Sequence, residues 1–321
     1  MRCILEIPLA IAVLAAPVLH AAAPTVAYVA NNFSNSVSVI NVNTNAVIAT
    51  IPVGSVPTEL AVTLNHKYVI VTNQFGGTVS VIATATNSVV STIPVGSTPV
   101  GVTTSLDGKF AYVTVAGENV LAIIDLSSFT VAERVPVGPA PTRVSLTPDG
   151  NLAYVSNQNS NFISVVSTAT RTVVNTIVVS GSSPYGLAFT PDGNRAYVVV
   201  VGANAVDVID TTALAVIGVI SVGASPTDIA MTGDGATAYV NNQHSNTVSV
   251  IDTTTNRVIA TVPVGVLPSG IAVSPNQKLV YVSNNGANTE SVINTTTNTV
   301  IATIPVGSNP VGVVLANVSH R

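Results

Sequence analysis

A unit of about 42 residues recurs seven times along this chain, and that repeat limits what the sequence can fold into. The clearest copy is residues 239–268, where two alternating apolar runs, VSVI and VIATVPV, flank a turn-rich TTTN. Each unit carries a residue equivalent to the Tyr of a Tyr-Val pair: Tyr28, Ile70, Tyr112, Tyr154, Tyr197, Tyr239 and Tyr281. Each also has a Gly-x-x-Pro, with prolines Pro57, Pro99, Pro141, Pro184, Pro226, Pro268 and Pro310. A fixed period in this range indicates a solenoid, a propeller or another repeat array.

The apolar segments inside each unit are short, rich in Val and Ile, and alternate with Thr or Ser. That pattern is typical of strands, whose side chains alternate with a period of two. We count four strands per unit, separated by turn-rich stretches such as Pro148-Asp149-Gly150 and the TTTN segments. Four antiparallel strands in roughly 40–45 residues are the size of one propeller blade.

The two ends of the repeat array complement each other. The array begins with second-strand sequence at Val26–Asn31 and ends just after first-strand sequence at Val311–Ala316. We therefore predict an all-β, seven-bladed β-propeller with four antiparallel strands per blade, closed by the C-terminal strand pairing with the N-terminal blade. An open solenoid is the alternative, but solenoids need capping units, whereas the terminal units here are as regular as the central ones.

The first 23 residues differ from the rest of the chain. Residues 1–23 combine Arg2, an apolar stretch and Ala21-Ala22-Ala23, which is typical of a secretory signal peptide. A membrane anchor is the alternative, but the apolar run is shorter than the ~20 residues that span a bilayer. We expect residues 24–321 to form one monomeric extracytoplasmic domain (secreted, periplasmic or at the cell surface) with no transmembrane segment. The only cysteine, Cys3, lies in the predicted signal peptide, so no disulfide is expected.

Composition excludes several function classes. Only 7% of residues are charged, the net charge is −4, and no basic run occurs. This argues against nucleic-acid binding, which needs clustered Lys and Arg to contact phosphates. The part that follows residue 23 has three scattered His, no Cys and no acidic cluster. We therefore expect no transition-metal centre and no cofactor, while calcium at a cluster of Asp and backbone carbonyls stays an open alternative.

Several copies of the unit resemble the YVTN β-propeller repeat. The matching segments are AYVANN at 27–32, YVSN at 154–157 and 281–284, YVNN at 239–242, SVID at 249–252, TTTN at 253–256, VIATVPVG at 258–265 and PSGIAVSP at 268–275. The resemblance covers residues 24–321 and implies a seven-bladed, secreted or surface-located propeller. Similar repeats occur in archaeal surface-layer proteins and in bacterial periplasmic proteins, one of them associated with single-stranded DNA. The family shares no catalytic motif, so the resemblance implies no catalytic residues.

Candidate functional residues are those that break the repeat near the predicted channel mouth. Two residues after the proline, four units have glycine: Gly101, Gly186, Gly270 and Gly312. The other three units carry Glu59, Arg143 and Asp228, which alternate around a ring of seven. They are candidates for a polar-ligand or ion site, and the alternative is a structural ion cluster or solvated charges.

Other candidates lie in the loops predicted beside the channel. His244 follows the second strand of the unit that contains Asp228, and a His–Asp pair is a common general base. Phe75 and Tyr185, together with Phe33 and Phe162, can form a stacking rim or fill gaps between blades. The repeated turn residues Asp107, Asp149, Asp192 and Asp234 are expected to cap their own turns.

Three functional hypotheses follow from these residues. The first is a non-enzymatic scaffold that binds a protein, glycan or cell-envelope partner through its upper loops and channel mouth. The second is a hydrolase or lyase at the channel mouth that uses Glu59, Arg143, Asp228 and His244. The third is a structural module of the cell surface. The fold does not choose between them, because propellers host many activities.

Overall fold

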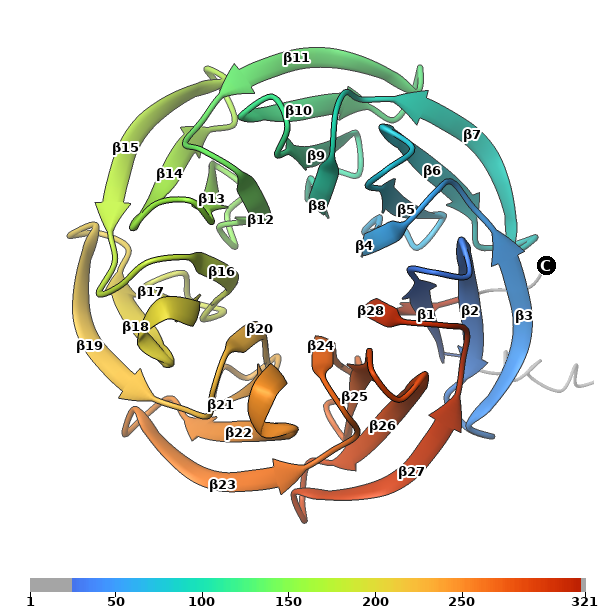
Figure 1. Cartoon of the computed structure of the whole chain (residues 1–321). Helices are drawn as coiled ribbons and strands as arrows, with labels where there is room; N and C mark the ends of the chain where they lie inside the picture. Colours follow the sequence, from blue (N-terminus) through green and yellow to red (C-terminus); the bar gives the residue numbers. More distant parts are fainter. Residues whose placement is uncertain (1–24, 319–321) are drawn as a thin grey trace, which may run out of the picture.

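The computed structural model describes residues 25–318, which form a closed ring of seven four-stranded antiparallel sheets (Figure 1). The predicted propeller fold is therefore confirmed. The predicted signal peptide, residues 1–23, and His320 lie outside the described residues. Within residues 25–318, no helix combines the length and hydropathy needed to cross a membrane.

Every blade runs from an inner strand at the channel to an outer strand at the edge of the ring. Blade 1 holds, in that order, β28 (Pro310–Asn317), β1 (Thr25–Asn31), β2 (Ser36–Asn41) and β3 (Ala46–Pro52). Blade 2 holds β4 (Pro57–Val62), β5 (Tyr68–Asn73), β6 (Thr78–Ala83) and β7 (Ser88–Pro94). Blade 3 holds β8 (Pro99–Thr104), β9 (Phe110–Val115), β10 (Val120–Asp125) and β11 (Thr130–Pro136). Blade 4 holds β12 (Pro141–Leu146), β13 (Leu152–Asn157), β14 (Phe162–Ser167) and β15 (Thr172–Val178).

The remaining blades follow the same order. Blade 5 holds β16 (Pro184–Phe189), β17 (Arg195–Val200), β18 (Ala205–Asp210) and β19 (Ala215–Ser221). Blade 6 holds β20 (Pro226–Met231), β21 (Thr237–Asn242), β22 (Thr247–Asp252) and β23 (Arg257–Pro263). Blade 7 holds β24 (Pro268–Val273), β25 (Leu279–Asn284), β26 (Thr289–Asn294) and β27 (Thr299–Pro305). Two short 3₁₀ helices, η1 (Val201–Ala203) and η2 (Gln243–Ser245), follow the second strands of blades 5 and 6.

The ring is closed by the two ends of the chain. Strand β28 pairs with β1 in antiparallel register, with Val314 opposite Tyr28 and Ala316 opposite Val26. The Thr25 hydroxyl also donates to Asn317 Oδ1 at 2.8 Å. The closure predicted from the sequence is confirmed, so each inner strand has a neighbour on both sides of the ring.

Apolar side chains are buried mainly between neighbouring blades. Seven hydrophobic clusters occupy the seven blade-to-blade interfaces, and each draws on the second, third and inner strands of two adjacent sheets. The second and third strands are buried on both faces, as in β5 and β6, which explains why they read as nearly continuous apolar runs. The outer strands instead show alternating exposure, as in β23 and β27.

The repeated Tyr is part of this packing. Six of the seven units have Tyr at this position, and five of these side chains, from Tyr28, Tyr154, Tyr197, Tyr239 and Tyr281, are among the largest fully buried ones. Tyr28 Oη donates to Asn87 Oδ1 in blade 2 at 2.7 Å. Tyr197 makes the same bond to Asn256 in the next blade, also at 2.7 Å. Tyr28, Tyr197 and Tyr239 thus pack inside one interface and also bond a turn of the adjacent blade.

We call the face that carries the loops between second and third strands the upper face. The loops between a fourth strand and the next blade's inner strand lie on the same face, because the two loop types bond each other. Asn35 adopts a left-handed φ of 49°, and its Oδ1 accepts from Val56 N at 2.8 Å. Asn119, Asn204, Asn246 and Asn288 do the same in other blades. This bond ties the two loop types together in five of the seven blades.

Turns on the opposite, lower face are held by their own side chains. Asp149 accepts from Thr147 Oγ1 and from Asn151 N, while Gly150 supplies the positive φ of 74°. The corresponding carboxylates of Asp107, Asp192 and Asp234 bond in the same way. These bonds stabilise the charged form and lower the pKa of each carboxyl. The predicted turn-capping role is confirmed.

The Tyr hydroxyls give a test of this packing. We expect Tyr28→Phe to lower the free energy of unfolding by about 1 kcal/mol, because it removes the bond to Asn87. Tyr281→Phe is the matched control, since the buried Tyr281 hydroxyl has no hydrogen-bond partner in the described residues. Urea unfolding of both variants measures the difference. Equal destabilisation by the two substitutions would contradict the assignment.

Candidate functional site

Three charged side chains meet across the channel at the level of the upper loops. Glu59 on β4, Arg143 on β12 and Asp228 on β20 come from alternate inner strands, which surround the central opening in Figure 1. The Arg143 guanidinium bridges both acids: its Nη1 pairs with Glu59 Oε2, and its Nη2 lies 3.2 Å from Asp228 Oδ2. The three side chains are only 12–15% exposed. We call this group the channel trio.

The glycines at the same repeat position make room for the trio. A Cβ on Gly186 would overlap Asp228 Oδ1, and a Cβ on Gly101 would overlap the Thr142 carbonyl oxygen. Adjacent inner strands thus approach so closely that a side chain fits only at alternate blades. The sequence predicted the positions of the trio, and the structure brings its three members together.

A cavity of about 380 Å³ lies against the trio. Its walls are the inner-strand residues that follow the trio along the chain, toward the lower face, and they include Leu60, Val144, Leu187 and Ile229. Small side chains such as Ala61 and Ala230 line the next level. The cavity therefore has one charged end, and Thr103, Thr104 and Ser145 add hydroxyl groups to its walls.

Burial controls the ionisation of the trio. It raises the pKa of Glu59 to about 7, and Asp228 adds to this rise while Arg143 opposes it. Burial also raises the pKa of Asp228, and Arg143 again opposes the shift. One guanidinium therefore compensates two buried carboxyl groups incompletely.

Two other predicted residues lie near the upper loops, but His244 does not pair with the trio. His244 Nδ1 lies 2.8 Å from Ser225 Oγ, so its partner is this serine rather than Asp228. Tyr185, on β16, lies against the trio: the Arg143 Cζ is 5.3 Å from its ring centroid. This cation–π contact adds a fourth side chain to the trio's surroundings.

The upper loops carry two strongly exposed aromatic side chains. Phe33 is 72% exposed and Phe75 is 77% exposed, at equivalent positions in blades 1 and 2. Phe162 begins β14 and is half-buried. Of the predicted aromatic rim, Phe33 and Phe75 thus face solvent, whereas Tyr185 packs beside the channel.

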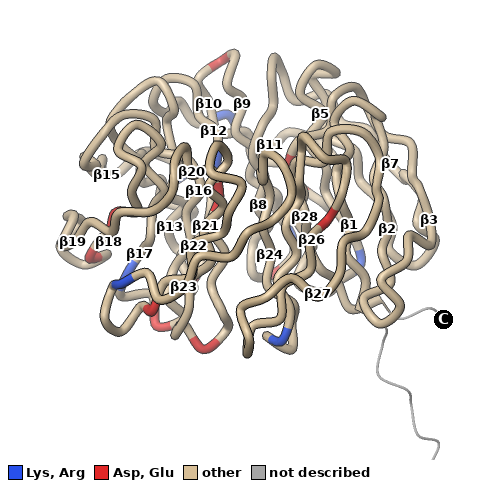
Figure 2. Tube along the Cα trace, turned by 60° about the horizontal axis from the view of Figure 1, so that its bottom comes forward, with Lys and Arg blue, Asp and Glu red and all other residues tan. Residues whose placement is uncertain are grey.

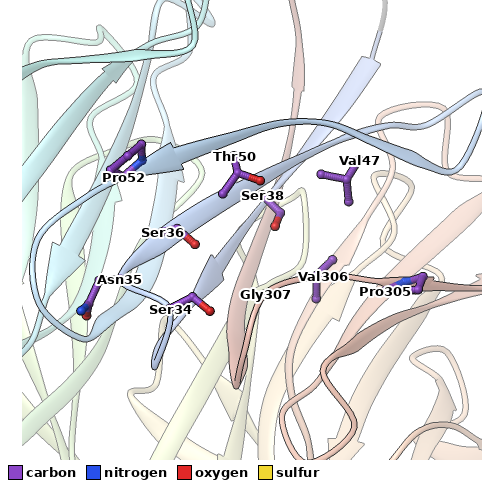
Figure 3. Close-up of a pocket in the computed structure, with 10 residues that line it drawn as sticks. All are labelled: Ser34, Asn35, Ser36, Ser38, Val47, Thr50, Pro52, Pro305, Val306 and Gly307. Atoms are coloured by element: carbon purple, nitrogen blue, oxygen red, sulfur yellow. The ribbon is translucent and has the colours of Figure 1, made fainter.

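A groove of about 560 Å³ lies at the seam between blades 7 and 1, beside the loop that contains Phe33 (Figure 3). Ser34, Asn35 and Thr50 contribute its polar groups from blade 1, and Pro305 and Val306 line it from blade 7. None of the ten residues that line it is ionisable. A similar groove of about 490 Å³ lies beside Phe75. Figure 2 shows how sparse the charged residues are over the ring.

The upper rim differs in blades 3 and 5, where the sequence replaces the repeated Asn by Val115 and Val200. In other blades this Asn is buried, and in blade 2 Asn73 Nδ2 donates to Ser80 Oγ. In blade 5 the buried Asp207 accepts from the backbone N and the hydroxyl of Ser180 at 2.7 and 2.6 Å. Our sequence reasoning missed Asp207, although it breaks a repeat position that is otherwise Ser or Ala.

Glu290 is a second residue that the sequence reasoning missed. It lies fully buried on β26, opposite Ser283, and neither carboxyl oxygen has a hydrogen-bond partner in the described residues. Burial raises its pKa to about 8. The sequence marks Glu290 by TESVIN at 289–294, where the preceding unit has TVSVID at 247–252. The other six units have Val, Leu or Ile at the position of Glu290.

Comparison with known proteins places the chain among propellers. A family model described as a YNCE-like beta-propeller matches residues 5–321. No curated protein matches the sequence. Within residues 25–318, no group of three or more His, Cys, Asp or Glu is arranged to hold a metal ion.

Solved structures share the fold at low sequence identity. Hydrazine synthase of Kuenenia stuttgartiensis is 23% identical with a TM-score of 0.78, covering 84% of this chain and 92% of that chain. A functionally unknown protein of Desulfotomaculum acetoxidans is 18% identical with a TM-score of 0.82, covering 92% and 99%. The dihydro-heme d1 dehydrogenase NirN, in complex with DHE, is 13% identical with a TM-score of 0.69, covering 90% and 74%. These similarities show the fold alone.

The charge balance of the channel trio can be tested by substitution. We expect Arg143→Gly to lower the free energy of unfolding by about 3–5 kcal/mol, because it leaves two carboxyl groups buried without a cation. The triple change of Glu59, Arg143 and Asp228 to Gly is the comparison, since it removes every charge together. We expect the triple variant to be more stable than the single variant in urea unfolding. A triple variant less stable than Arg143→Gly would contradict this account.

The buried carboxyl group of Glu290 should make the stability depend on pH. Its folded-state pKa of about 8 exceeds the ordinary value of 4.5, so the folded state binds a proton that the unfolded state has lost. Between about pH 5 and 8, this group should therefore lower the stability by up to about 1.4 kcal/mol for each unit of rising pH. Thermal unfolding of Glu290→Gln should show a weaker pH dependence than the parent protein. Glu290→Val should raise the stability at pH 8 by about 1–3 kcal/mol, and an unchanged pH profile in both variants would refute the assignment.

Proposed function

We propose that this chain, which belongs to the YNCE-like β-propeller family, is a non-enzymatic scaffold that binds a protein, glycan or cell-envelope partner. The partner binds through the upper loops and the channel mouth. On the expectation from residues 1–23, we place this role outside the cytoplasm.

The observation that carries the proposal is the pair of exposed phenylalanines, Phe33 and Phe75, on neighbouring blades. Large aromatic side chains at 72% and 77% exposure are suited to anchoring a partner, because covering them removes apolar surface from water. Phe75 lines a groove of uncharged residues together with Gln74 and Thr98. Ser34 and Asn35, which follow Phe33 in the chain, line a second uncharged groove. This chemistry suits a partner recognised by hydrogen bonds and apolar contact.

The construction of the upper face supports a scaffold role. The loop of Phe33 is bonded to the preceding blade through Phe33 N and Ser308 O at 3.2 Å, and the loop of Phe75 through Gly76 N and Ser55 O at 3.3 Å. Loops fixed in this way lose little conformational freedom when a partner binds. The two side chains are therefore presented in a set arrangement.

The arrangement of charged groups favours binding over catalysis. At the channel mouth the guanidinium of Arg143 already pairs with both acids of the trio. The imidazole of His244 is bonded to Ser225 and not to the carboxylate of Asp228 that a general base would use. The hydrolase or lyase alternative thus lacks the His244–Asp228 pair on which it was based.

The phenylalanine pair provides the test. We expect Phe33→Ser with Phe75→Ser to weaken binding to cell-envelope fragments and their purified glycans at least about tenfold, because two apolar anchors are lost. Leu64→Ser with Leu106→Ser is the matched control, since these leucines are 63% and 45% exposed on lower turns of two adjacent blades. Biolayer interferometry of both double variants measures the effect.

Two outcomes would contradict the proposal. Equal loss of binding in both double variants would remove the special role of the upper face. Self-association of the parent protein at micromolar concentration in analytical ultracentrifugation, abolished by the phenylalanine changes, would instead favour the structural-module hypothesis.

A further inference from the structure

A cavity of about 260 Å³ lies on the lower face between blades 4 and 5, on the opposite side of the ring from the upper loops. Its volume is close to the lower limit of small-molecule sites, about 300 Å³. Lower turns of both blades line it, with Asp149 from blade 4 and Asp192, Thr211 and Thr212 from blade 5. None of the ten described residues that line it is basic.

The hydroxyl group of Tyr154 is a buried donor at this cavity. Tyr154, on β13, is fully buried and lines the cavity, and its Oη has no hydrogen-bond partner among the described residues. Burial raises the pKa of Tyr154 to about 12, so the hydroxyl keeps its proton at neutral pH. A buried donor without an acceptor costs about 1–3 kcal/mol. A ligand that supplies an acceptor removes this cost.

A break in the repeat explains why Tyr154 lacks a partner. In three other interfaces the equivalent Tyr hydroxyl donates to an Asn that ends the turn between the third and fourth strands of the next blade: Asn87, Asn256 and Asn298. Blade 5 has Leu214 at this position, and its side chain packs in the apolar cluster of Tyr154. The same turn contains Thr211 and Thr212, which line the cavity. The cavity thus lies beside the turn that lacks the acceptor.

Two carboxylates at the cavity keep free acceptor positions. Asp149 Oδ1 accepts two bonds within its own turn, whereas its Oδ2 accepts only from Asn151 Nδ2 in the described residues. Asp192 is bonded in the same way, and its Oδ2 accepts only from Asn194 Nδ2. A carboxylate oxygen has two lone pairs, so each Oδ2 can accept one more bond. The turn bonds lower the pKa of both carboxyls, so both are ionised at neutral pH.

We infer that this cavity binds a small neutral polyhydroxyl compound, a monosaccharide. One hydroxyl oxygen of the sugar accepts from Tyr154, and other hydroxyls donate to the Oδ2 atoms of Asp149 and Asp192. The inference does not rest on the upper-face binding proposed above.

The donors and acceptors of the cavity select this class of ligand. An anion would face two ionised carboxylates without a basic residue in the lining. An ammonium ion can donate to the carboxylates, but it has no lone pair to accept from Tyr154. Residues 25–318 contain no group of three His, Cys, Asp or Glu arranged to hold a metal ion. A sugar hydroxyl both donates and accepts, and the C–H groups of a sugar ring can pack on Pro148 and Leu152.

The test uses the methyl α-D-pyranosides of glucose, galactose and mannose as probes of one ring. Cyclohexanol, cyclohexylammonium and glucuronate are the controls for the hydroxyl groups, for positive charge and for negative charge. Ligand-observed NMR titration of the full chain should show at least one of the methyl glycosides binding at least about tenfold tighter than each control.

Four variants test the proposed contacts. Tyr154→Phe should weaken binding about three- to tenfold without lowering the free energy of unfolding, because the lost hydroxyl has no partner in the described residues. Leu214→Asn should weaken binding by a similar factor, because it restores the acceptor that other blades offer to the Tyr hydroxyl. Asp192→Asn should also weaken binding. Asp234→Asn is its matched control, since Asp234 bonds the equivalent turn of blade 6, and it should bind the sugar like the parent protein.

Four outcomes would overturn the inference. They are cyclohexanol or either charged control binding as tightly as every methyl glycoside, no binding of the three glycosides at millimolar concentration, unchanged binding in Tyr154→Phe, and equal losses in Asp192→Asn and Asp234→Asn. If Asp192→Asn does not fold, Tyr154→Phe decides alone. Phe33→Ser with Phe75→Ser should leave binding of the methyl glycosides unchanged, so failure of either proposal is seen separately.

Discussion

Packing between neighbouring blades is the interaction on which the rest of this molecule depends. A four-stranded sheet has two apolar faces and cannot cover them alone, so each blade needs a neighbour on either side. The seven interfaces cover both faces of every blade only if the ring closes, because an open array would expose one apolar face of each terminal blade to water. The position of every inner strand around the channel, and thus of the channel trio, follows from that closure.

The fold could be predicted from the sequence down to the pairing of Val26–Asn31 with Val311–Ala316. This was possible because strand chemistry, turn residues and a fixed period all agree in seven copies, and agreement between levels specifies a single structure. The repeat also predicted which residues share a level of the channel. It located Glu59, Arg143 and Asp228 because each replaces a glycine at one position in the unit.

What the sequence could not supply was the direction and partner of each side chain. The position of His244 in the unit suggested Asp228 as its partner, but its ring bonds Ser225 in the adjacent loop. Phe75 and Tyr185 were both predicted as aromatic residues near one face, yet one faces solvent and the other contacts Arg143. Glu290 and Asp207 each replace one residue inside a strand whose repeat pattern is otherwise intact, so the pattern alone gave no sign of them. Whether such an acidic side chain is buried depends on which face of its strand is covered by a neighbouring blade.

The closing strand also has a consequence for the order in which the chain folds. Blades 2 to 7 are each made from one continuous segment, so all four strands of each are present as soon as that segment has been synthesised. Blade 1 must wait, because its inner strand begins at Pro310 while its other three strands are made first. Until β28 has been synthesised, β1 presents an unpaired edge, the kind of surface on which nascent chains aggregate. The synthesis of β28 thus decides when the edge of β1 stops being exposed to aggregation.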